Sequence, residues 1–296
     1  MYVVVGANGY LGSYIVKNII ENTKSTVVAT ARRLERVFHM GRVKWVYCDV
    51  TEENSVKCLS DIINKADEPV NLIYLSAYHH PDEVEKNRLT AWNVNVTCLS
   101  RFLENVCGDV QRFIYASTDS VYGESINHYH FKETDKLNPV NFYGHCKCAA
   151  EALVIHNGFS VVRFPFLISP SLVYKPHFYD QIVETLKSGS DIEMYIDSYR
   201  SSLSFDNAAY LLMLLLERAI DFDIINICGD NDLSKFDVGC LIAKKENISI
   251  DNIIPVSILK RNLNFVTRRA GSTLMSNEVL KKVTGIKKID IFEKPQ

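Results

Sequence analysis

Two residues four positions apart, Tyr143 and Lys147, are of the types that could transfer a proton to a carbonyl group. The run from Cys148 to Ile155 behind them has a helical pattern, and positions i and i+4 of a helix lie on one face. The phenol and the ammonium group should therefore point the same way, so that the tyrosine could act as a proton donor. A solvated surface pair has the same spacing. The catalytic interpretation therefore requires a cofactor site and further polar groups elsewhere in the chain.

A glycine-rich segment near the start of the chain predicts a phosphate-binding loop. Tyr2 to Val5 form a β-branched run typical of a buried parallel strand, GANGYLG follows at 6 to 12, and a helical pattern runs from Ser13 to Glu21. Glycines let the backbone approach a pyrophosphate, and a helix N-terminus directs free N–H groups at it. The spacing is GxxGxxG instead of GxGxxG, and a plain glycine-rich turn is the alternative. The expected cofactor contacts here are Gly6, Asn8, Gly9, Tyr10, Leu11 and Gly12.

The end of the second expected strand, Thr26 to Ala31, bears on which dinucleotide is bound. Arg32 and Arg33 follow this strand, where an NAD-specific fold carries an acidic residue for the ribose 2′-hydroxyl. Guanidinium groups pair bidentately with phosphate and would suit a 2′-phosphate. The sequence therefore favours NADP(H), with NAD(H) still possible. A solvent-exposed basic turn is the alternative.

Three more segments are expected to line the cofactor site. The strand from Lys44 to Tyr47 leads to an acidic residue that could bind the adenine amine or simply cap the next helix. The strand from Val70 to Leu75 leads to small residues, and the expected helix from Asn87 to Val106 carries an asparagine among apolar neighbours that could brace the loop beneath the cofactor. These cofactor residues are Asp49, Val50, Leu75, Ser76, Ala77 and Asn95, with Tyr143 and Lys147 themselves.

The fifth expected strand, Arg112 to Ala116, ends in STDSVYG at 117 to 123. Catalytic groups of an open parallel sheet gather at the carboxyl ends of its strands, which is where these hydroxyls fall. Serine and threonine after a strand are also common helix caps and turn formers. The segment could therefore supply the second half of a site with the tyrosine helix.

The alternation of strand and helix predicts an α/β fold with a doubly wound, Rossmann-type parallel sheet. A sixth strand is expected from Ser160 to Phe164, and a last one from Ile224 to Cys228. We expect a dinucleotide-binding domain over 1–165, to which 200–228 returns, with an extended segment from Arg200 to Phe205 and a helix from Asn207 to Ala219. The remaining pieces of 166–296 should form a smaller C-terminal substrate-binding lobe.

Composition excludes several other classes. The chain has 296 residues, of which 47% are hydrophobic and 23% charged, and a net charge of −2, so a nucleic-acid partner is not expected. Its eight cysteines (48, 58, 98, 107, 146, 148, 228, 240) are scattered, which favours reduced thiols in a cytoplasmic protein. We expect no signal peptide, membrane span or metal site, since no apolar run is long enough and His79 and His80 lack further ligands at a suitable spacing.

Several motifs together make the chain resemble the extended short-chain dehydrogenase/reductase family, in its nucleotide-sugar branch. They are GANGYLG at 6 to 12, CDV at 48 to 50, LSAY at 75 to 78, NVNVTCLSRFLE at 93 to 104, STDSVYG, ETDKLNPVNFYGHCK at 133 to 147, RSSLSFDNAA at 200 to 209 and RRAGSTLMSNEVLKKVTG at 268 to 285. The resemblance is greatest to the dTDP-4-dehydrorhamnose reductases. It implies that Thr118, Tyr143 and Lys147 are catalytic, and that Lys147 holds the nicotinamide ribose and favours the phenolate. It also implies substrate contacts at Asp119, Ser120 and Arg200.

The implied function is NADPH-dependent reduction of a nucleotide-linked 4-keto deoxysugar in carbohydrate biosynthesis, by a homodimer. Ser120 stands where the related 4,6-dehydratases have a glutamate base, which argues against dehydration because a hydroxyl cannot take that proton. Cys98 stands where the family helix usually has glycine, which suggests altered packing. Two alternatives are an epimerase with tightly bound NAD and a non-catalytic NADP-binding regulatory protein.

Overall fold

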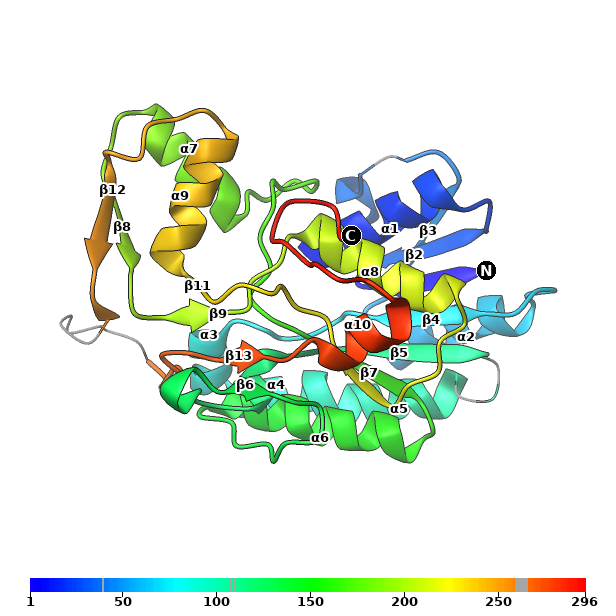
Figure 1. Ribbon diagram of the computed structural model, residues 1–296. Coiled ribbons are helices and arrows are strands. Elements are labelled where there is room, and N and C mark those ends of the chain that lie inside the picture. Colours follow the sequence, from blue (N-terminus) through cyan, green and yellow to red (C-terminus); the bar gives the residue numbers. More distant parts are fainter. Residues whose placement is uncertain (39, 107, 109, 259–265) are drawn as a thin grey trace.

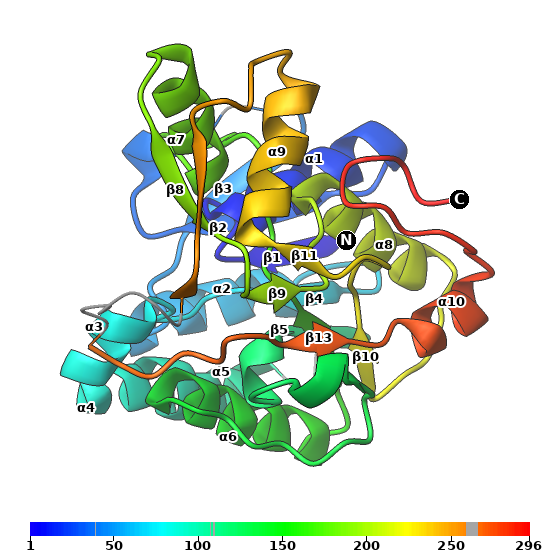
Figure 2. The same ribbon diagram turned by 60° about the vertical axis from the view of Figure 1, so that its left-hand side comes forward.

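The centre of the computed structural model is a seven-stranded parallel sheet (Figures 1 and 2). Its strand order is β10-β7-β5-β4-β1-β2-β3. In chain order the strands are β1 Tyr2–Val5, β2 Val27–Ala31, β3 Val43–Tyr47, β4 Asn71–Tyr74, β5 Arg112–Thr118, β7 Ser160–Phe164 and β10 Ile224–Asn226. The order reverses between β1 and β4, and ligands of open parallel sheets bind at such a switch point. The predicted doubly wound sheet is therefore confirmed.

Helices cover both faces of this sheet. Figure 1 shows α1 (Tyr10–Asn22) and α8 (Phe205–Glu217) on one face, and α2 (Glu53–Asn64), α5 (Cys98–Val106) and α6 (Phe142–His156) on the other. Strands covered on both faces must be apolar throughout, and every residue of β1 and β2 is buried. The sheet is thus held rigidly from both sides, which fixes the positions of its strand ends.

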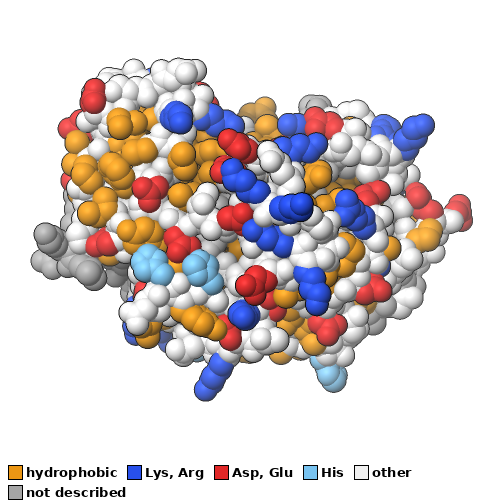
Figure 3. Space-filling view, viewed as in Figure 1, with side chains coloured by type: hydrophobic (Ala, Val, Ile, Leu, Met, Phe, Trp, Pro, Cys, Tyr) orange, Lys and Arg blue, Asp and Glu red, His pale blue; other side chains and the backbone are white. Residues whose placement is uncertain are grey.

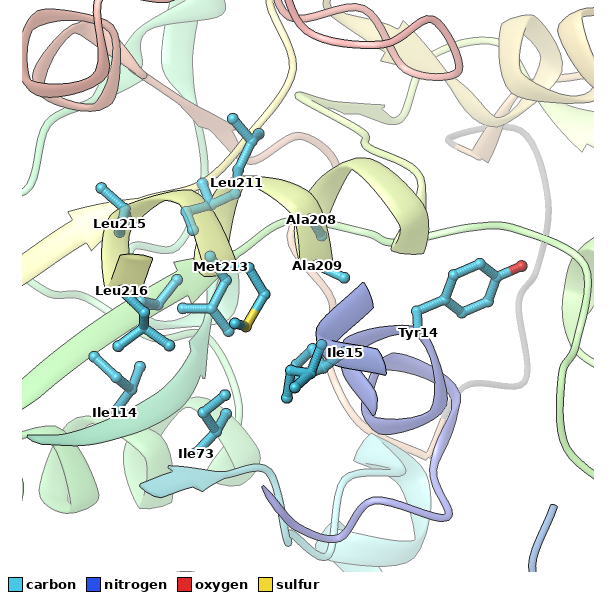
Figure 4. Packing of buried hydrophobic residues seen from close by; sticks show 14 of the residues in the cluster. Tyr14, Ile15, Ile73, Ile114, Ala208, Ala209, Leu211, Met213, Leu215 and Leu216 are labelled. Atoms are coloured by element: carbon cyan, nitrogen blue, oxygen red, sulfur yellow. The ribbon is translucent and has the colours of Figure 1, made fainter. Parts of the chain in front are cut away.

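The face under α1 and α8 is a tightly packed apolar core. Figure 4 shows Ile15 of α1 directed toward side chains of α8 and of the sheet, among them Ile73 and Ile114. Ala208 and Ala209 lie on the part of α8 nearest α1, and their small side chains let the two helices come close. Helix α1, which follows the glycine loop, is therefore anchored by α8, a segment about two hundred residues away in the sequence.

The region predicted as one helix from Asn87 to Val106 is divided. Helix α3 (Pro81–Lys86) comes first, and Asn87, with φ −127° and ψ 53°, separates it from α4 (Arg88–Trp92). A π-helical turn over Asn93–Thr97 then joins α4 to α5. Single π turns are often found at functional sites, and this one contains Asn95. The prediction was right about the helical path and missed both α3 and the π turn.

A small module built from four elements stands beside the sheet. It consists of α7 (Phe178–Lys187), β8 (Ile192–Tyr195), α9 (Lys235–Lys245) and β12 (Ile253–Val256), with β8 and β12 paired in parallel. Buried apolar residues of all four elements form its own core. Gly239 of α9 lies against the Met194 sulfur, so a larger residue there would force the Met194 side chain to move. The module is therefore a packed unit and not a loose extension.

Two short strand pairs join the small module to the rest of the chain. β9 (Tyr199–Arg200) pairs antiparallel with β11 (Leu233–Ser234), and β13 (Leu274–Met275) pairs in parallel with β6 (His130–Phe131). Both views place β9, β11 and β13 between the small module and the α6 side of the sheet (Figures 1 and 2). An extended segment was expected from Arg200 to Phe205. In the structure its first residue belongs to β9, and α8 already begins at Phe205. β9 pairs with β11 and not with a strand of the main sheet. The last helix, α10 (Glu278–Thr284), leads into the C-terminal segment.

The structure describes residues 1–38, 40–106, 108, 110–258 and 266–296. Within these ranges no helix is long and apolar enough to cross a membrane, and no group of histidine, cysteine and acidic residues could hold a metal ion. The described cysteines are all free thiols, and Cys107 lies outside the described residues. On the face drawn in Figure 3, lysine and arginine alternate with aspartate and glutamate over α8 and α10, so neither charge dominates there.

Candidate active site

Thr118 is the last residue of β5, at the carboxyl edge of the sheet. Its hydroxyl donates to the Asp119 carboxylate at 3.0 Å and accepts from the Ser120 backbone N–H at 3.2 Å. The second contact caps the short 3₁₀ turn Asp119–Val121, so this hydroxyl has the capping role that the sequence left open. The contacts fix the threonine side chain at the sheet edge, and capping does not prevent its hydroxyl from also facing a substrate.

The helix that carries Tyr143 is brought against this turn by a glycine. Asn141 caps α6 by accepting from the Gly144 N–H at 3.0 Å. A Cβ atom on Gly144 would lie 2.6 Å from the Ser120 carbonyl oxygen and 2.6 Å from the Pro139 Cβ, so only glycine allows this approach. Tyr143 is therefore held next to the Thr118 turn by its neighbour in the sequence.

The Tyr143 phenol holds its proton at neutral pH. Burial raises its pKa above the ordinary value for tyrosine, and the nearby Asp119 carboxylate raises it further. This differs from the expectation that Lys147 would favour the phenolate. A protonated phenol is nevertheless the form that can give a proton to a carbonyl oxygen.

Lys147 lies on the same face of α6 and is almost completely buried. Its ammonium group donates to the Ala116 carbonyl at 2.6 Å and lies 4.0 Å from the centroid of the Tyr115 ring. Burial lowers its pKa from the ordinary value to about 7, although the Glu151 carboxylate one turn further along acts in the opposite direction. The lysine is therefore directed at the end of β5, and its charge is sensitive to pH near neutrality.

The glycine loop between β1 and α1 has the shape that a pyrophosphate requires. A Cβ on Gly12 would lie 2.6 Å from the Gly6 carbonyl oxygen, and Gly6 itself has a φ of +83°. No side chain caps the N-terminus of α1, whose first turn has no acidic residue, so its N–H groups suit an anion. The Asn8 Oδ1 atom is buried without a partner within the described part of the chain. These features fit a bound dinucleotide.

Other expected cofactor residues lie at the same edge of the sheet. The side chains of Arg32 and Arg33 are exposed directly after β2. Asp49 follows β3 and accepts from the N–H and the hydroxyl of Thr51 at 2.9 and 2.7 Å, so it has the turn-forming role that the sequence left open. Val50 is buried beside it.

The loop after β4 passes close to the glycine loop. A Cβ on Gly6 would lie 3.1 Å from the Ser76 nitrogen, so the segment of Leu75, Ser76 and Ala77 lies beside Gly6. Asn95 accepts from the Tyr78 N–H at 2.8 Å and donates to the Tyr78 carbonyl at 2.9 Å. The expected bracing of this loop by Asn95 is therefore present.

Tyr10 and Leu11 belong to the start of α1, and the ring of Tyr10 is used for packing. Its hydroxyl donates to the Pro176 carbonyl at 2.9 Å, and its ring lies 4.5 Å from that of His177. Leu11 packs against the core beneath α1 and α8. The loop thus contacts the segment that leads to the small module, and these two residues can offer a cofactor mainly their backbone.

The opposite wall of the site is rich in cations. The Arg200 guanidinium lies 3.5 Å from the Asp119 carboxylate and donates to the carbonyls of Tyr199, Ala270 and Gly271 at 2.7 to 2.8 Å. Burial raises the pKa of Asp119, although Arg200 and the Thr118 and Ser120 hydroxyls lower it. Asp119 and Arg200, both expected substrate contacts, are thus paired with each other, and Ser120 completes the same turn.

Two residues near the site were missed from the sequence. Lys235, the first residue of α9, lies over the Phe166 ring, and burial holds its pKa well below the ordinary value for lysine. Glu151 follows Lys147 by four residues and is buried in an ion pair with Arg163. Glu151 could have been found from the sequence, because it continues the helical spacing of Tyr143 and Lys147. No local sequence pattern indicates that Lys235 lies near the site.

Comparisons with known proteins agree with this geometry. The profile of the RmlD substrate-binding domain family matches residues 1–293. Methionine adenosyltransferase 2 subunit beta of Danio rerio is 24% identical over 262 residues, 86% of this chain and 76% of that protein. The dTDP-D-glucose 4,6-dehydratase of Mus musculus is 29% identical over 195 residues, 61% of this chain, and the match spans about half (52%) of that protein.

Two solved structures share the fold over nearly the whole chain. The dTDP-4-dehydrorhamnose reductase of Bacillus anthracis, in complex with NADP, has a TM-score of 0.81 at 19% identity and covers 98% of this chain and 94% of its own. MoeE5, in complex with UDP-glucuronic acid and NAD, has a TM-score of 0.77 at 22% identity and covers 98% and 94%. The chain therefore belongs to the RmlD substrate-binding domain family and has the fold of the extended short-chain dehydrogenase/reductases.

Proposed function

We propose that this protein reduces the keto group of a nucleotide-linked 4-keto deoxysugar with NADPH, as a dTDP-4-dehydrorhamnose reductase does. The observation that carries the proposal is the position of Tyr143, a protonated phenol beside the Thr118 turn and on the same helix face as Lys147. A hydroxyl that can donate a proton, a second hydroxyl beside it and a buried cation are what reduction of a carbonyl requires.

The nicotinamide cofactor, when bound, supplies the hydride. Tyr143 gives its proton to the keto oxygen, and the Thr118 hydroxyl turns from the Asp119 carboxylate to donate its hydrogen bond to the same oxygen as negative charge develops there. Lys147, in its ammonium form, stabilises the phenolate that remains. One cation at about 4 Å in an effective dielectric near 20 contributes about 4 kcal/mol before desolvation is subtracted. Lys147 can therefore stabilise the phenolate substantially, but only while its amino group is protonated.

The preference for NADPH is supported by Arg32 and Arg33. Both are exposed where β2 ends, at the edge of the sheet that carries the glycine loop, and the segment just after β2 (Arg32–Arg33) offers no carboxylate for a ribose 2′-hydroxyl. The structural neighbours do not decide the matter, because one was solved with NADP and another with NAD.

The nucleotide-linked character of the substrate is supported by the cationic wall. Arg200 and Lys235 both act on the Asp119 carboxylate, whereas Arg269, which also acts on Lys235, is paired with Asp82 at 2.9 Å. A diphosphate would balance this excess of positive charge. Ser120, with a hydroxyl in the place of a carboxylate base, supports simple reduction over dehydration.

The test is NADPH oxidation, followed at 340 nm, against a panel of dTDP- and UDP-linked 4-keto sugars together with the free sugars. We expect turnover with at least one nucleotide-linked ketone and none with the free sugars. Turnover of none of them, by protein that binds NADPH, would contradict the proposal.

A non-catalytic role is the second candidate, and one observation favours it. The relative from Danio rerio, which matches 86% of this chain, is named as a subunit of a methionine adenosyltransferase. If the chain were a non-catalytic NADP-binding subunit, it would bind NADPH without consuming it. The side chains of Thr118, Tyr143 and Lys147 support the reductase instead.

An epimerase would contain tightly bound NAD after purification and would not consume NADPH, so an absorption spectrum of the purified protein distinguishes it.

We also propose that the protein is a cytoplasmic homodimer that associates through α4 and α6. Leu89 is 89% exposed and Trp92 is 42% exposed on α4, and the Trp92 ring lies 6.4 Å from that of Phe142 on α6. Such an exposed apolar cluster on two adjacent helices suits a second copy of the same surface. Sedimentation of the wild type should give a dimer, and Leu89→Lys with Trp92→Lys should give a monomer. A wild-type monomer would contradict the proposal.

A further inference from the structure

A buried ion pair lies directly behind the Tyr143 site. The Arg163 guanidinium donates twice to the Glu151 carboxylate, from Nη2 to Oε2 at 2.6 Å and from Nε to Oε1 at 3.0 Å, and both side chains are nearly inaccessible. Ser117, next to Thr118, also donates its hydroxyl to Glu151. The pair therefore joins α6, which carries Tyr143 and Lys147, to the end of β5 and to β7.

The pair is oriented, with its negative end toward the active site. Glu151 follows Lys147 by one helical turn on the same face of α6, and its carboxylate meets Ser117. The guanidinium of Arg163 faces the other way, since its Nη1 donates to the Tyr122 hydroxyl at 2.7 Å and to the Glu133 carbonyl at 3.2 Å. Lys147 is thus closer to the anion of the pair than to the cation.

Stability alone does not explain this arrangement. A buried ion pair can often be replaced by apolar residues of similar volume without loss of stability, because desolvation offsets the attraction of the two charges. Lys147, by contrast, has much to gain from a nearby anion. Its buried ammonium group is faced by Cys146 on α6, by the Ala116 carbonyl and the Tyr115 ring on β5, and by His79 from the loop after β4. Of the described groups that act on it, Glu151 is the carboxylate.

We propose that Glu151 is a positioning residue that keeps Lys147 protonated in the buried site, and that Arg163 and Ser117 hold its carboxylate in place. Arg163 fixes both carboxylate oxygens, and Ser117 ties the same group to the residue before Thr118. One buried network then sets both the position of the Thr118 hydroxyl and the charge of the lysine. The importance of that charge for turnover rests on the proposed reductase function, whereas its dependence on Glu151 does not.

The test is a direct titration of Lys147 by NMR, in protein labelled with ¹³C at lysine Cε and with the resonance assigned through Lys147→Met. In the wild type the pKa of Lys147 is expected near 7. Glu151→Gln keeps the shape and an oxygen acceptor but removes the charge, so the pKa should fall by about one unit or more. Ser117→Ala removes one hydrogen bond to the carboxylate, which Arg163 still holds through both oxygens, so there the pKa should change by less than about 0.3.

Turnover gives the second readout. The pH above which kcat falls should move down in Glu151→Gln together with the pKa of Lys147, while KM for NADPH at pH 6 stays unchanged. A shifted titration in protein without any reductase activity would count against the proposed function and for the role of Glu151. A Lys147 pKa within about 0.3 of the wild-type value in Glu151→Gln would overturn the inference.

A folding control keeps the result interpretable. Glu151→Gln leaves the Arg163 guanidinium buried without its partner, which is strongly destabilising in many proteins. The double variant Glu151→Gln with Arg163→Gln removes both charges and avoids that penalty. Because the carboxylate is the nearer of the two charges, the pKa of Lys147 should fall in this variant as well, and an unchanged or raised value would overturn the inference.

Discussion

The two walls of the candidate site hold their charges in different ways. In the wall of β5, α6 and β7, the Glu151 carboxylate is bonded by Arg163 and Ser117, and Lys147 is bonded to a backbone carbonyl. In the wall of β9 and α9, Arg200 and Lys235 act on one carboxylate, Asp119. Each wall sets two cations against one carboxylate, but in the first wall both cations donate hydrogen bonds within the wall. In the second wall Lys235 lies over the Phe166 ring, where its ammonium group could bind a phosphate of a ligand. Changes in the first wall should therefore affect the chemical step, and changes in the second should affect substrate binding.

The largest effect is expected at Tyr143. Tyr143→Phe removes the proton donor and leaves the ring, so kcat should fall by about 1,000-fold or more, which is within the range for loss of a general acid. NADPH affinity, measured by fluorescence titration, should change less than about twofold, because no phosphate contact is lost. Tyr174→Phe, at an exposed tyrosine, is the matched control and should keep full activity. Turnover close to the wild-type rate in Tyr143→Phe would remove the phenol from the mechanism.

Lys147 should show its burial in the pH dependence of stability. Burial lowers its pKa from 10.5 to about 7, so between these values the unfolded chain binds a proton that the folded chain does not. Stability therefore rises with pH across this window, relative to Lys147→Met, which cannot titrate. Between pH 6.5 and 9.5 the difference between the two proteins should change in favour of the wild type by about 3 kcal/mol.

Urea unfolding of both proteins at several pH values measures this change. Parallel curves for the wild type and Lys147→Met would mean that the lysine titrates in the folded protein as it does in water. The first wall would then be no more constrained than the second, and the contrast between them would be lost.

In the second wall, Lys235→Met should raise KM for the nucleotide-linked substrate by about 30-fold while kcat changes little, since a charged hydrogen bond to a phosphate is worth about 2 kcal/mol. Lys244→Met, at an exposed position near the other end of α9, is the matched control and should have the wild-type KM. A fall in kcat with an unchanged KM would assign Lys235 to the chemical step and erase the distinction between the walls.

The sequence allowed the first wall to be predicted far better than the second. β1 and β5 are apolar runs that lead into glycine or hydroxyl residues, and β2 is an apolar run that leads into Arg32, so local pattern alone locates the strand ends and their polar groups. Tyr143 and Lys147 could be assigned to one face because helical spacing is a local property. Glu151 continues that spacing on α6, but its partner Arg163 lies on β7. A contact between two such segments cannot be predicted from the sequence of either one.

The second wall depends on contacts between distant segments. β8 pairs with β12 and β9 with β11 across more than thirty residues, and such short strands carry too few residues to show a period. Lys235 begins an ordinary helix, and only the packing of α9 against the Phe166 segment gives it a special environment. The π turn that contains Asn95 likewise coincides with a tertiary contact, the hydrogen bond to Tyr78, which the local sequence does not show.

The smallest effect is expected at Arg32, an exposed cation that extends the comparison to the cofactor. Arg32→Ala should weaken NADPH binding by about tenfold and leave NADH binding unchanged, because solvent screens an exposed guanidinium more than a buried one. Arg101→Ala, at an exposed arginine of α5, should alter neither affinity. Titration of each variant with both cofactors provides the measurement. Equal losses for NADPH and NADH would mean that Arg32 does not contact a 2′-phosphate, and exposed cations would then contribute less to binding than the cations of the second wall.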